Sequence, residues 1–127
     1  MRYLLDTHVV IWYAENSPKL SAKMKEIIKL PENKIYICAV SLWETAIKIN
    51  LGKLKLNFTF DELLNDIRSG DFNIMQIEDD YLKSLSSLPF IHRDPFDRLL
   101  IATAKAEDMT ILTADENIQK YDIHWIW

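Results

Sequence analysis

Carboxylates occupy the places in this sequence where apolar runs end and where helices are expected to begin. Asp6 directly follows a short apolar run, and Asp115 lies two residues beyond another. Glu44 falls in the first turn of an expected helix, and further acids flank the start of the longest expected helix. The acids at these boundaries are Asp6, Glu44, Asp94, Asp97 and Asp115. A fold that gathers them at one edge creates a strongly acidic site.

A cluster of carboxylates has a definite chemistry. Two carboxylates about 4 Å apart repel by about 4 kcal/mol at an effective dielectric constant near 20. A larger group is unfavourable unless some members stay protonated or a cation neutralises them. Ligand sets made only of oxygen select hard ions, which favours Mg²⁺ or Mn²⁺ over zinc. Such an ion activates a water molecule and stabilises developing negative charge, as phosphodiester hydrolysis requires.

Most of these acids also have a purely structural interpretation. Ser41 and Glu44 have the S-x-x-E spacing of a capping box, and residues 94–97 read as an N-cap, a proline and a first-turn acid. Asp115 can cap the short helix that follows it. A cap contributes about 1 kcal/mol, so each acid taken singly is explained by capping as well as by chemistry. Asp6 resists this explanation, because it ends one apolar run and closely precedes another.

The elements that must position these acids alternate between strand and helix. Strands are expected at residues 3–5, 35–40, 72–77, 109–113 and 123–127. Helices are expected from residue 6 to about 14, then at 21–30, 41–50, 59–68, around 81–85, at 96–108 and at 116–121. This alternation implies an α/β fold with a mostly parallel sheet covered on both faces. In such sheets ligands bind beyond the carboxyl ends of the strands, which is where the acids would meet.

The amino-acid composition limits the classes of protein to which the chain could belong. The 127 residues are 49% hydrophobic, show no internal repeat or linker, and are read as one domain over residues 1–127. Only two glycines are present, which excludes the glycine-rich loops that bind dinucleotides and nucleoside triphosphates. The formal net charge of -4 argues against a protein that coats nucleic acid, but not against an enzyme that cuts it with acidic residues.

The single cysteine and the spacing of charges indicate the compartment. Cys38 has no partner for an internal disulfide or a multi-cysteine zinc site, so we expect a reducing, cytoplasmic environment. Charged residues interrupt every apolar stretch, so neither a membrane-spanning segment nor a signal peptide is expected.

Four segments of the chain resemble the PIN-domain ribonucleases, and among them the VapC-type toxins of bacterial toxin–antitoxin pairs. The matching segments are Leu5-Asp6-Thr7-His8, Ser41-Leu42-Trp43-Glu44 with Lys48 and Gly52-Lys53-Leu54, residues 92–102, and Leu112-Thr113-Ala114-Asp115. Their order and spacing are those of the family and together they cover essentially the whole chain. The block at 92–102 is the most distinctive of them.

The resemblance implies a three-layer α/β/α fold with a central, mostly parallel sheet of about five strands. It also implies a metal-dependent endoribonuclease that uses Mg²⁺ or Mn²⁺. The family's acidic quartet falls on Asp6, Glu44, Asp97 and Asp115, with Thr113 and Thr7 as hydroxyls near the metal. Asp94 is either an extra acid of the site or a helix cap, and its proline neighbour favours the cap.

The resemblance further implies partners. It implies that the substrate is RNA, often transfer RNA. It also implies that a small antitoxin covers the active site with its C-terminal segment and that the toxin forms a homodimer. The alternative is a catalytically silent PIN-like module that binds proteins, which should have lost at least one acid, whereas this chain has all four. A phosphoacceptor receiver domain fits poorly because Thr7 follows Asp6, and a D-x-D phosphatase because His8 stands at the second aspartate position.

Several other side chains invite functional readings. Arg93 and Arg98 flank the acids and either contact a scissile phosphate or balance the acid cluster. Structural or surface roles are expected for the three histidines, which are His8, His92 and His124. A solvated face is expected for the basic patch formed by Lys48, Lys53 and Lys55. The tryptophans are expected to pack, with Trp12 and Trp43 in the core or a dimer interface and with Trp125 and Trp127 from the last strand.

Overall fold

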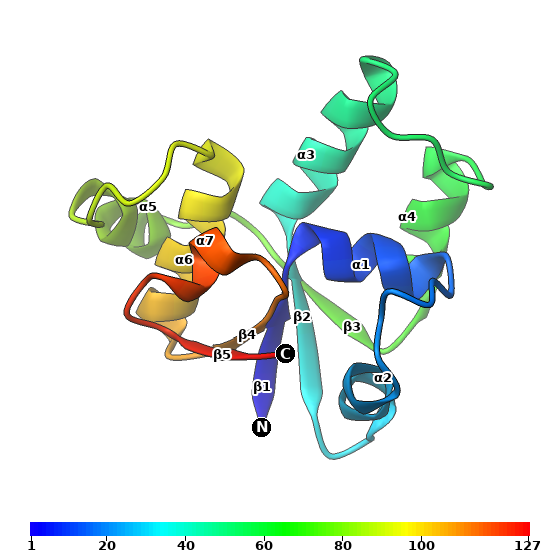
Figure 1. The fold of residues 1–127 in the computed structure, drawn as a ribbon, viewed down its shortest axis with the longest axis horizontal. Helices are drawn as coiled ribbons and strands as arrows, with labels where there is room; N and C mark the ends of the chain where they lie inside the picture. The colour runs from blue at the N-terminus through cyan, green and yellow to red at the C-terminus, as the bar shows by residue number, and fades with distance from the viewer.

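The computed structural model describes all 127 residues and contains five strands and seven helices (Figure 1). The strands are β1 (Arg2–Leu5), β2 (Lys34–Cys38), β3 (Phe72–Met75), β4 (Thr110–Leu112) and β5 (His124–Ile126). The helices are α1 (Thr7–Ala14), α2 (Ala22–Lys29), α3 (Ala39–Asn50), α4 (Phe60–Ser69), α5 (Asp79–Ser86), α6 (Pro95–Glu107) and α7 (Glu116–Gln119). The expected alternation of strand and helix is confirmed.

The five strands form one sheet in the order β3-β2-β1-β4-β5, and every neighbouring pair is parallel. The first strand of the chain is therefore the central one. From β1 the chain builds outward to β2 and β3, then returns across β1 to add β4 and β5. The direction of building reverses between β1 and β4, and such a reversal opens a crevice at the carboxyl ends of those two strands.

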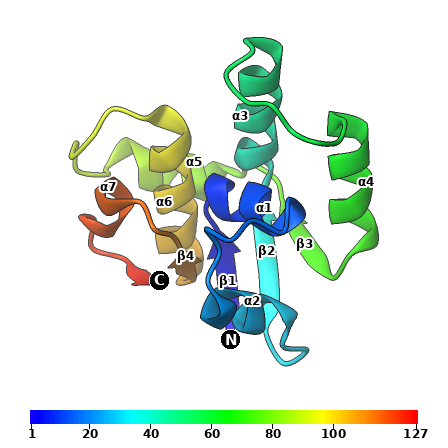
Figure 2. The ribbon, with the colours of Figure 1, turned by 45° about the vertical axis from the view of Figure 1, so that its right-hand side comes forward.

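Helices cover both faces of the sheet, which makes the predicted three-layer architecture. Figures 1 and 2 show α1, α2 and α4 on one side of the sheet and α5, α6 and α7 on the other, while α3 rises from the carboxyl edge. Successive side chains of a strand point to opposite faces. Leu5 accordingly joins the core beneath α1, α2 and α4, and Leu4 joins the core beneath α6.

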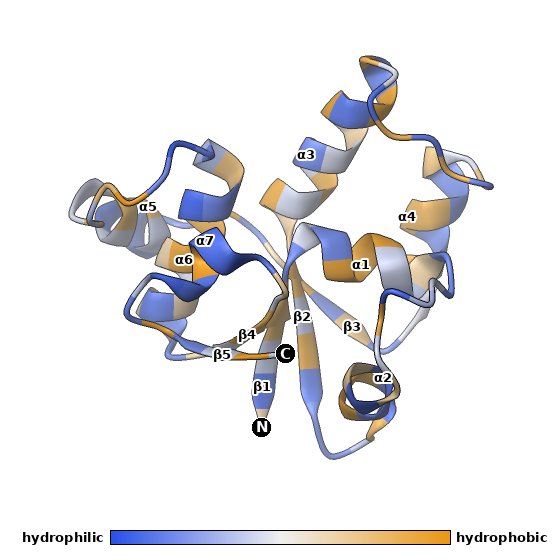
Figure 3. Cartoon of the chain, in the orientation of Figure 1, coloured by the Kyte–Doolittle hydropathy of each residue, from blue (hydrophilic) through white to orange (hydrophobic).

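Hydrophobic burial in the two cores holds the strands in place. Figure 3 shows hydrophobic strands and inward helix faces, with hydrophilic residues at the turns. Leu4 and Leu5 are both completely buried, and each burial contributes about 1.5–3 kcal/mol. None of the seven helices has the length and apolar character that crossing a membrane needs.

Local signals explain where several helices begin and end. The side chain of Ser21 caps α2, and Thr59 with Glu62 forms the expected capping box at the start of α4. Gly52 adopts φ +71° just after α3, a conformation that costs glycine little and other residues more. Gly70 ends α4 as expected.

One boundary differs from the prediction, and the difference matters for the site. The strand expected over residues 35–40 ends at Cys38, and α3 begins at Ala39 rather than at position 41. Val40 is β-branched and typical of strands, but here it packs into the α6-side core from the first turn of α3. Ser41 is therefore inside the helix and does not cap it, so the capping-box interpretation of Glu44 is wrong.

The tryptophans are less buried than expected. Trp43 is 57% exposed and meets Phe96 edge to face with ring centroids 5.3 Å apart, so it does not belong to the core of this chain. Trp125 on β5 is 42% exposed, so the prediction that it packs is wrong. Trp127 remains partly exposed but contacts Trp12, with centroids 5.8 Å apart.

Candidate active site at the carboxyl edge of the sheet

Two of the four quartet acids closely follow the ends of β1 and β4, and helices α3 and α6 supply the other two. Asp6 comes immediately after β1, and its backbone N–H donates to the carbonyl of Leu112 at the end of β4. Asp115 follows β4, and Glu44 lies in the helix that begins where β2 ends. Asp97 lies in the first turn of α6. The acids therefore approach the edge of the sheet where the strand order reverses.

Three of these carboxylates are buried. Asp6 and Glu44 are each 2% exposed, and Asp97 is 8% exposed. Aspartate and glutamate are almost never this buried unless a partner or a metal compensates the lost hydration. The amino ends of α1 and α6 lie beside Asp6 and Asp97, but a helix dipole stabilises a nearby anion by only about 0.3–1 kcal/mol. That gain is smaller than the cost of burying charge among like charges.

The raised pKa of Asp97 reflects this uncompensated cost of burying charge. Burial is the largest cause that raises the pKa of Asp97 to about 8, and the negative charges of Asp94, Asp6, Asp115 and Glu44 contribute in that order. Burial also raises the pKa of Asp6, with a smaller contribution in the same direction from Asp115. Carboxylates influence one another in this way only when they are close together. The four acids therefore lie within electrostatic range of one another near this edge of the sheet, as the sequence led us to expect.

Thr113 ties Asp6 to Asp115. Its hydroxyl donates to Asp6 Oδ2 at 2.8 Å and accepts the backbone N–H of Asp115 at 3.0 Å. Thr113 is fully buried, so this bond partly offsets the burial of the Asp6 carboxylate. Asp115 also caps α7, because its Oδ1 accepts the N–H of Asn117 at 2.8 Å. The capping interpretation of Asp115 is therefore confirmed, and this role leaves Asp115 close to Asp6 through Thr113.

Glu44 has one paired oxygen and one unpaired oxygen. Its Oε2 lies 2.7 Å from Nζ of Lys48, one helical turn further along α3. Burial alone would lower the pKa of Lys48, but the hydrogen bond and charge of Glu44 raise it above its ordinary value. Glu44 Oε1 is buried and has no hydrogen-bond partner. The expectation that Lys48 lies on a solvated basic face is therefore wrong, since its ammonium group is the counter-charge of a buried acid.

Asp94 caps α6, as its proline neighbour suggested. Its Oδ1 accepts the backbone N–H of Phe96 at 2.9 Å and that of Asp97 at 3.1 Å. Its charge still acts on the rest of the site, because after burial it is the largest cause of the raised pKa of Asp97. The hydroxyl of Thr7, another expected accessory residue, donates to Ser41 Oγ at 2.9 Å and so links the start of α1 to the first turn of α3.

The two arginines have different surroundings. Arg98 donates to the carbonyls of Leu88 and Pro89 and to the hydroxyl of Tyr121, which gives it a structural role in holding the loop before α6. Arg93 is exposed in that loop.

His92 contacts the site directly, which the sequence did not indicate. Its Nε2 lies 3.1 Å from Asp97 Oδ2, and its Nδ1 lies 2.9 Å from the hydroxyl of Tyr121. His8 and His124 are exposed, as expected. A histidine five residues before a buried aspartate carries no periodic signal, so only the fold of the loop reveals this contact.

The acids have the chemistry that a hard divalent cation requires. All four are oxygen donors, and the unpaired buried oxygen of Glu44 is an acceptor without a partner. No three His, Cys, Asp or Glu side chains are grouped closely enough to hold a metal ion as they stand. The donor set fits Mg²⁺ or Mn²⁺ in kind, with Asp6, Glu44, Asp97 and Asp115 as the candidate ligands.

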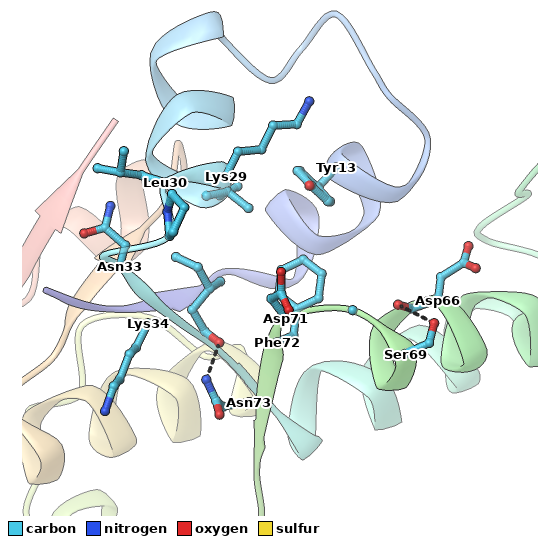
Figure 4. A pocket seen from close by; sticks show the side chains of 14 residues that line it. Tyr13, Lys29, Leu30, Asn33, Lys34, Asp66, Ser69, Asp71, Phe72 and Asn73 are labelled. Atoms are coloured by element: carbon cyan, nitrogen blue, oxygen red, sulfur yellow. Dashed lines mark hydrogen bonds between the residues drawn. The ribbon is translucent and has the colours of Figure 1, made fainter.

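A cavity of about 790 Å³ lies elsewhere, among the amino ends of β2 and β3 and the carboxyl ends of α2 and α4. Figure 4 shows its lining, which includes Lys29, Lys34 and Asp66 but none of the quartet. Unlike the acidic edge of the sheet, this cavity holds no group of buried titratable side chains.

The fold and the site define an α/β protein whose buried acids lie at the switch point of a parallel sheet. Residues 3–123 match the PIN domain family, and the chain belongs to that family. No curated protein was found to match the sequence.

Solved structures share this fold at low sequence identity. VapBC2 from Rickettsia felis, bound to a promoter DNA fragment, is 17% identical with a TM-score of 0.76 over 99% of this chain and 98% of its own. FitAcB from Neisseria gonorrhoeae is 17% identical with a TM-score of 0.70 over 98% and 96%. A toxin–antitoxin complex from Klebsiella pneumoniae is 17% identical with a TM-score of 0.65 over 98% and 96%.

Proposed function

We propose that residues 1–127 act as one PIN-type catalytic domain, a Mg²⁺- or Mn²⁺-dependent endoribonuclease that is the toxin of a toxin–antitoxin pair. One observation carries the proposal. Near the switch point of the sheet, the charges of Asp6, Glu44 and Asp115, which come from distant segments, act on the buried carboxyl group of Asp97. A purely structural role does not explain this cluster, because burying several acids close together lowers the stability of the folded state unless a cation is bound.

Each quartet residue has a part in holding the ion. Asp6, Glu44, Asp97 and Asp115 would bind it through carboxylate oxygens. Thr113 orients the Asp6 carboxylate through its hydrogen bond to Oδ2. The bound ion would supply positive charge against a phosphate oxygen and lower the pKa of an attacking water.

Other residues act on the substrate or on the helix that carries an acid. Arg93 is proposed to donate hydrogen bonds to a phosphate oxygen of the RNA, since its exposed guanidinium suits that geometry. Asp94 fixes the start of α6 and thereby the position of Asp97.

The partners are proposed from the comparisons. A neighbour in fold is a toxin–antitoxin complex, and VapBC2 and FitAcB are further neighbours. We therefore propose a cognate antitoxin as the protein partner, RNA (transfer RNA first) as the substrate, and a homodimer as the assembly. The competing function is a silent protein-binding module. The completeness of the acidic quartet favours the nuclease.

The proposal is tested by incubating the full chain with total transfer RNA in Mg²⁺, in Mn²⁺ and in EDTA. Asp97→Asn removes one quartet carboxylate, and Asp122→Asn is a matched control at an exposed acid outside the site. We expect cleavage by the wild type and by Asp122→Asn that requires the metal, and loss of cleavage in Asp97→Asn. Equal cleavage by all three proteins would reveal a contaminating nuclease. No cleavage, together with no Mn²⁺ binding in a calorimetric titration, would favour the binding module.

A further inference from the structure

The Asp97 carboxylate is held by a histidine that is itself held by a tyrosine. His92 Nε2 lies 3.1 Å from Asp97 Oδ2, and His92 Nδ1 lies 2.9 Å from the Tyr121 hydroxyl. The two rings also pack edge to face with centroids 5.4 Å apart. The side chains of His92 and Asp97 are each only 11% exposed, so water competes little for their hydrogen bond.

The surroundings of Tyr121 decide which nitrogen of His92 carries the proton. The Tyr121 oxygen accepts the backbone N–H of His92 at 3.3 Å and an N–H of Arg98 at 3.0 Å. A hydroxyl has two acceptor lone pairs and one proton, so with both lone pairs engaged its own proton is left to donate to Nδ1. A neutral imidazole that accepts at Nδ1 carries its proton on Nε2. That N–H then points at Asp97 Oδ2 and donates to it.

We propose that His92 is a positioning residue that Tyr121 and Arg98 hold as the Nε2–H tautomer, so that it fixes Asp97 Oδ2 and leaves Oδ1 free to face a cation. His92 supplies the only hydrogen bond that the Asp97 side chain makes with the protein. Without this bond the carboxylate would rotate about its terminal torsion, which has broad minima. The orientation of a metal ligand rests on the proposed function, whereas the tautomer does not.

Two other roles for His92 fit the contacts less well. A general base needs a free ring nitrogen, but both nitrogens of His92 are already engaged. A simple structural link between the loop and α6 would work with either tautomer and would leave ion binding unchanged. The positioning role therefore predicts a single tautomer of His92 and a loss of ion affinity when His92 is removed, and a structural link predicts neither.

The first test reads the tautomer in the metal-free wild-type chain by long-range ¹H–¹⁵N NMR at pH 9, where the Asp97 carboxyl group is ionised. We expect His92 to show an unprotonated Nδ1 and a protonated Nε2. A protonated Nδ1 would overturn the proposal. Tyr121→Phe removes the hydroxyl but keeps the ring, and we expect it to release the tautomer into a mixture. This test needs neither an ion nor RNA, so it decides the tautomer even if the chain cleaves nothing.

The second test measures Mn²⁺ affinity by calorimetry and RNA cleavage as separate kcat and KM values. Loss of an outer hydrogen-bond partner typically lowers metal affinity or activity by about 10–100-fold, which is the loss we expect in His92→Leu. His92→Gln can present an N–H in place of Nε2–H and should recover most of the affinity. His124→Leu changes an exposed histidine outside the site and serves as the control.

The outcomes separate the two proposals. Wild-type Mn²⁺ affinity and an unchanged kcat in a folded His92→Leu protein would reduce His92 to a structural link and leave the nuclease intact. If the wild type bound no Mn²⁺ and cut no RNA, the proposed function would fail together with the metal-directed half of the inference.

Discussion

The sharpest consequence of the acidic cluster is that removing one of its charges should stabilise the metal-free protein. Burial and neighbouring acids raise the pKa of Asp97 from 3.8 to about 8. The folded state therefore binds the Asp97 proton more tightly than the unfolded state does. This preference adds stability in full below about pH 4, and the added stability is lost as the pH rises towards 8.

The size of the stability change follows from the part of this pH range that an experiment can cover. Each pKa unit corresponds to about 1.4 kcal/mol, and about three units of the shift lie between pH 5 and pH 8. Through Asp97 alone, the wild type should lose about 4 kcal/mol of unfolding free energy between pH 5 and pH 9 in EDTA. Asp97→Asn has no proton to lose and keeps an oxygen that can accept from His92. The variant should therefore be the more stable protein at pH 9.

Urea denaturation at pH 5, 7 and 9 in EDTA measures this difference, with Asp122→Asn as the control that should follow the wild type. Adding Mn²⁺ at pH 7 should stabilise the wild type and leave Asp97→Asn nearly unchanged, because ligand binding to the folded state adds to stability. Identical pH dependence in the wild type and Asp97→Asn would refute the reasoning, since Asp97 would then carry no stored electrostatic cost.

Three further changes probe other contacts of the site. Lys48→Met removes the counter-charge of Glu44, so we expect the protein to lose about 1–3 kcal/mol of unfolding free energy in EDTA, measured by urea denaturation. Mn²⁺ should restore this stability, and a loss that persists in Mn²⁺ would contradict the prediction. Thr113→Val keeps the side-chain shape but removes the hydrogen bond to the buried Asp6, and should cost about 1–3 kcal/mol; an unchanged midpoint would show that the bond is dispensable. Arg93→Ala should raise KM for RNA and weaken its dependence on salt with little effect on folding, and an unchanged salt dependence would count against the phosphate contact.

The sequence predicted the parts of the site that follow from regular structure. Asp6 and Asp115 could be placed because apolar runs mark β1 and β4, and parallel strands end at one edge. Asp97 could be placed because the residues after it form a strong helix start. These inferences depend on the periodicity of apolar residues and on the direction of the strands, and short segments of the sequence are enough to predict both.

The contacts that the sequence did not reveal join side chains across loops. His92 meets Tyr121, which is 29 residues away, through the irregular path of the segment before α6. The role of Lys48 was hidden because the sequence pattern offered Glu44 as a capping residue. Since α3 begins two residues earlier than expected, Glu44 lies beyond the first turn as a buried acid, and its i,i+4 neighbour Lys48 is its counter-charge.

Lys48 also shows how the fold tolerates its acids before an ion arrives. A lone buried carboxylate costs several kcal/mol, and the Lys48 ammonium offsets that cost for one oxygen of Glu44. The other oxygen stays without a partner, and Asp97 keeps its proton up to a pH near 8. The cluster is thus only partly neutralised by the protein itself. A divalent cation that displaced the proton of Asp97 and paired with Glu44 Oε1 would complete the neutralisation, so ion binding and proton release should occur together and be measurable as one event.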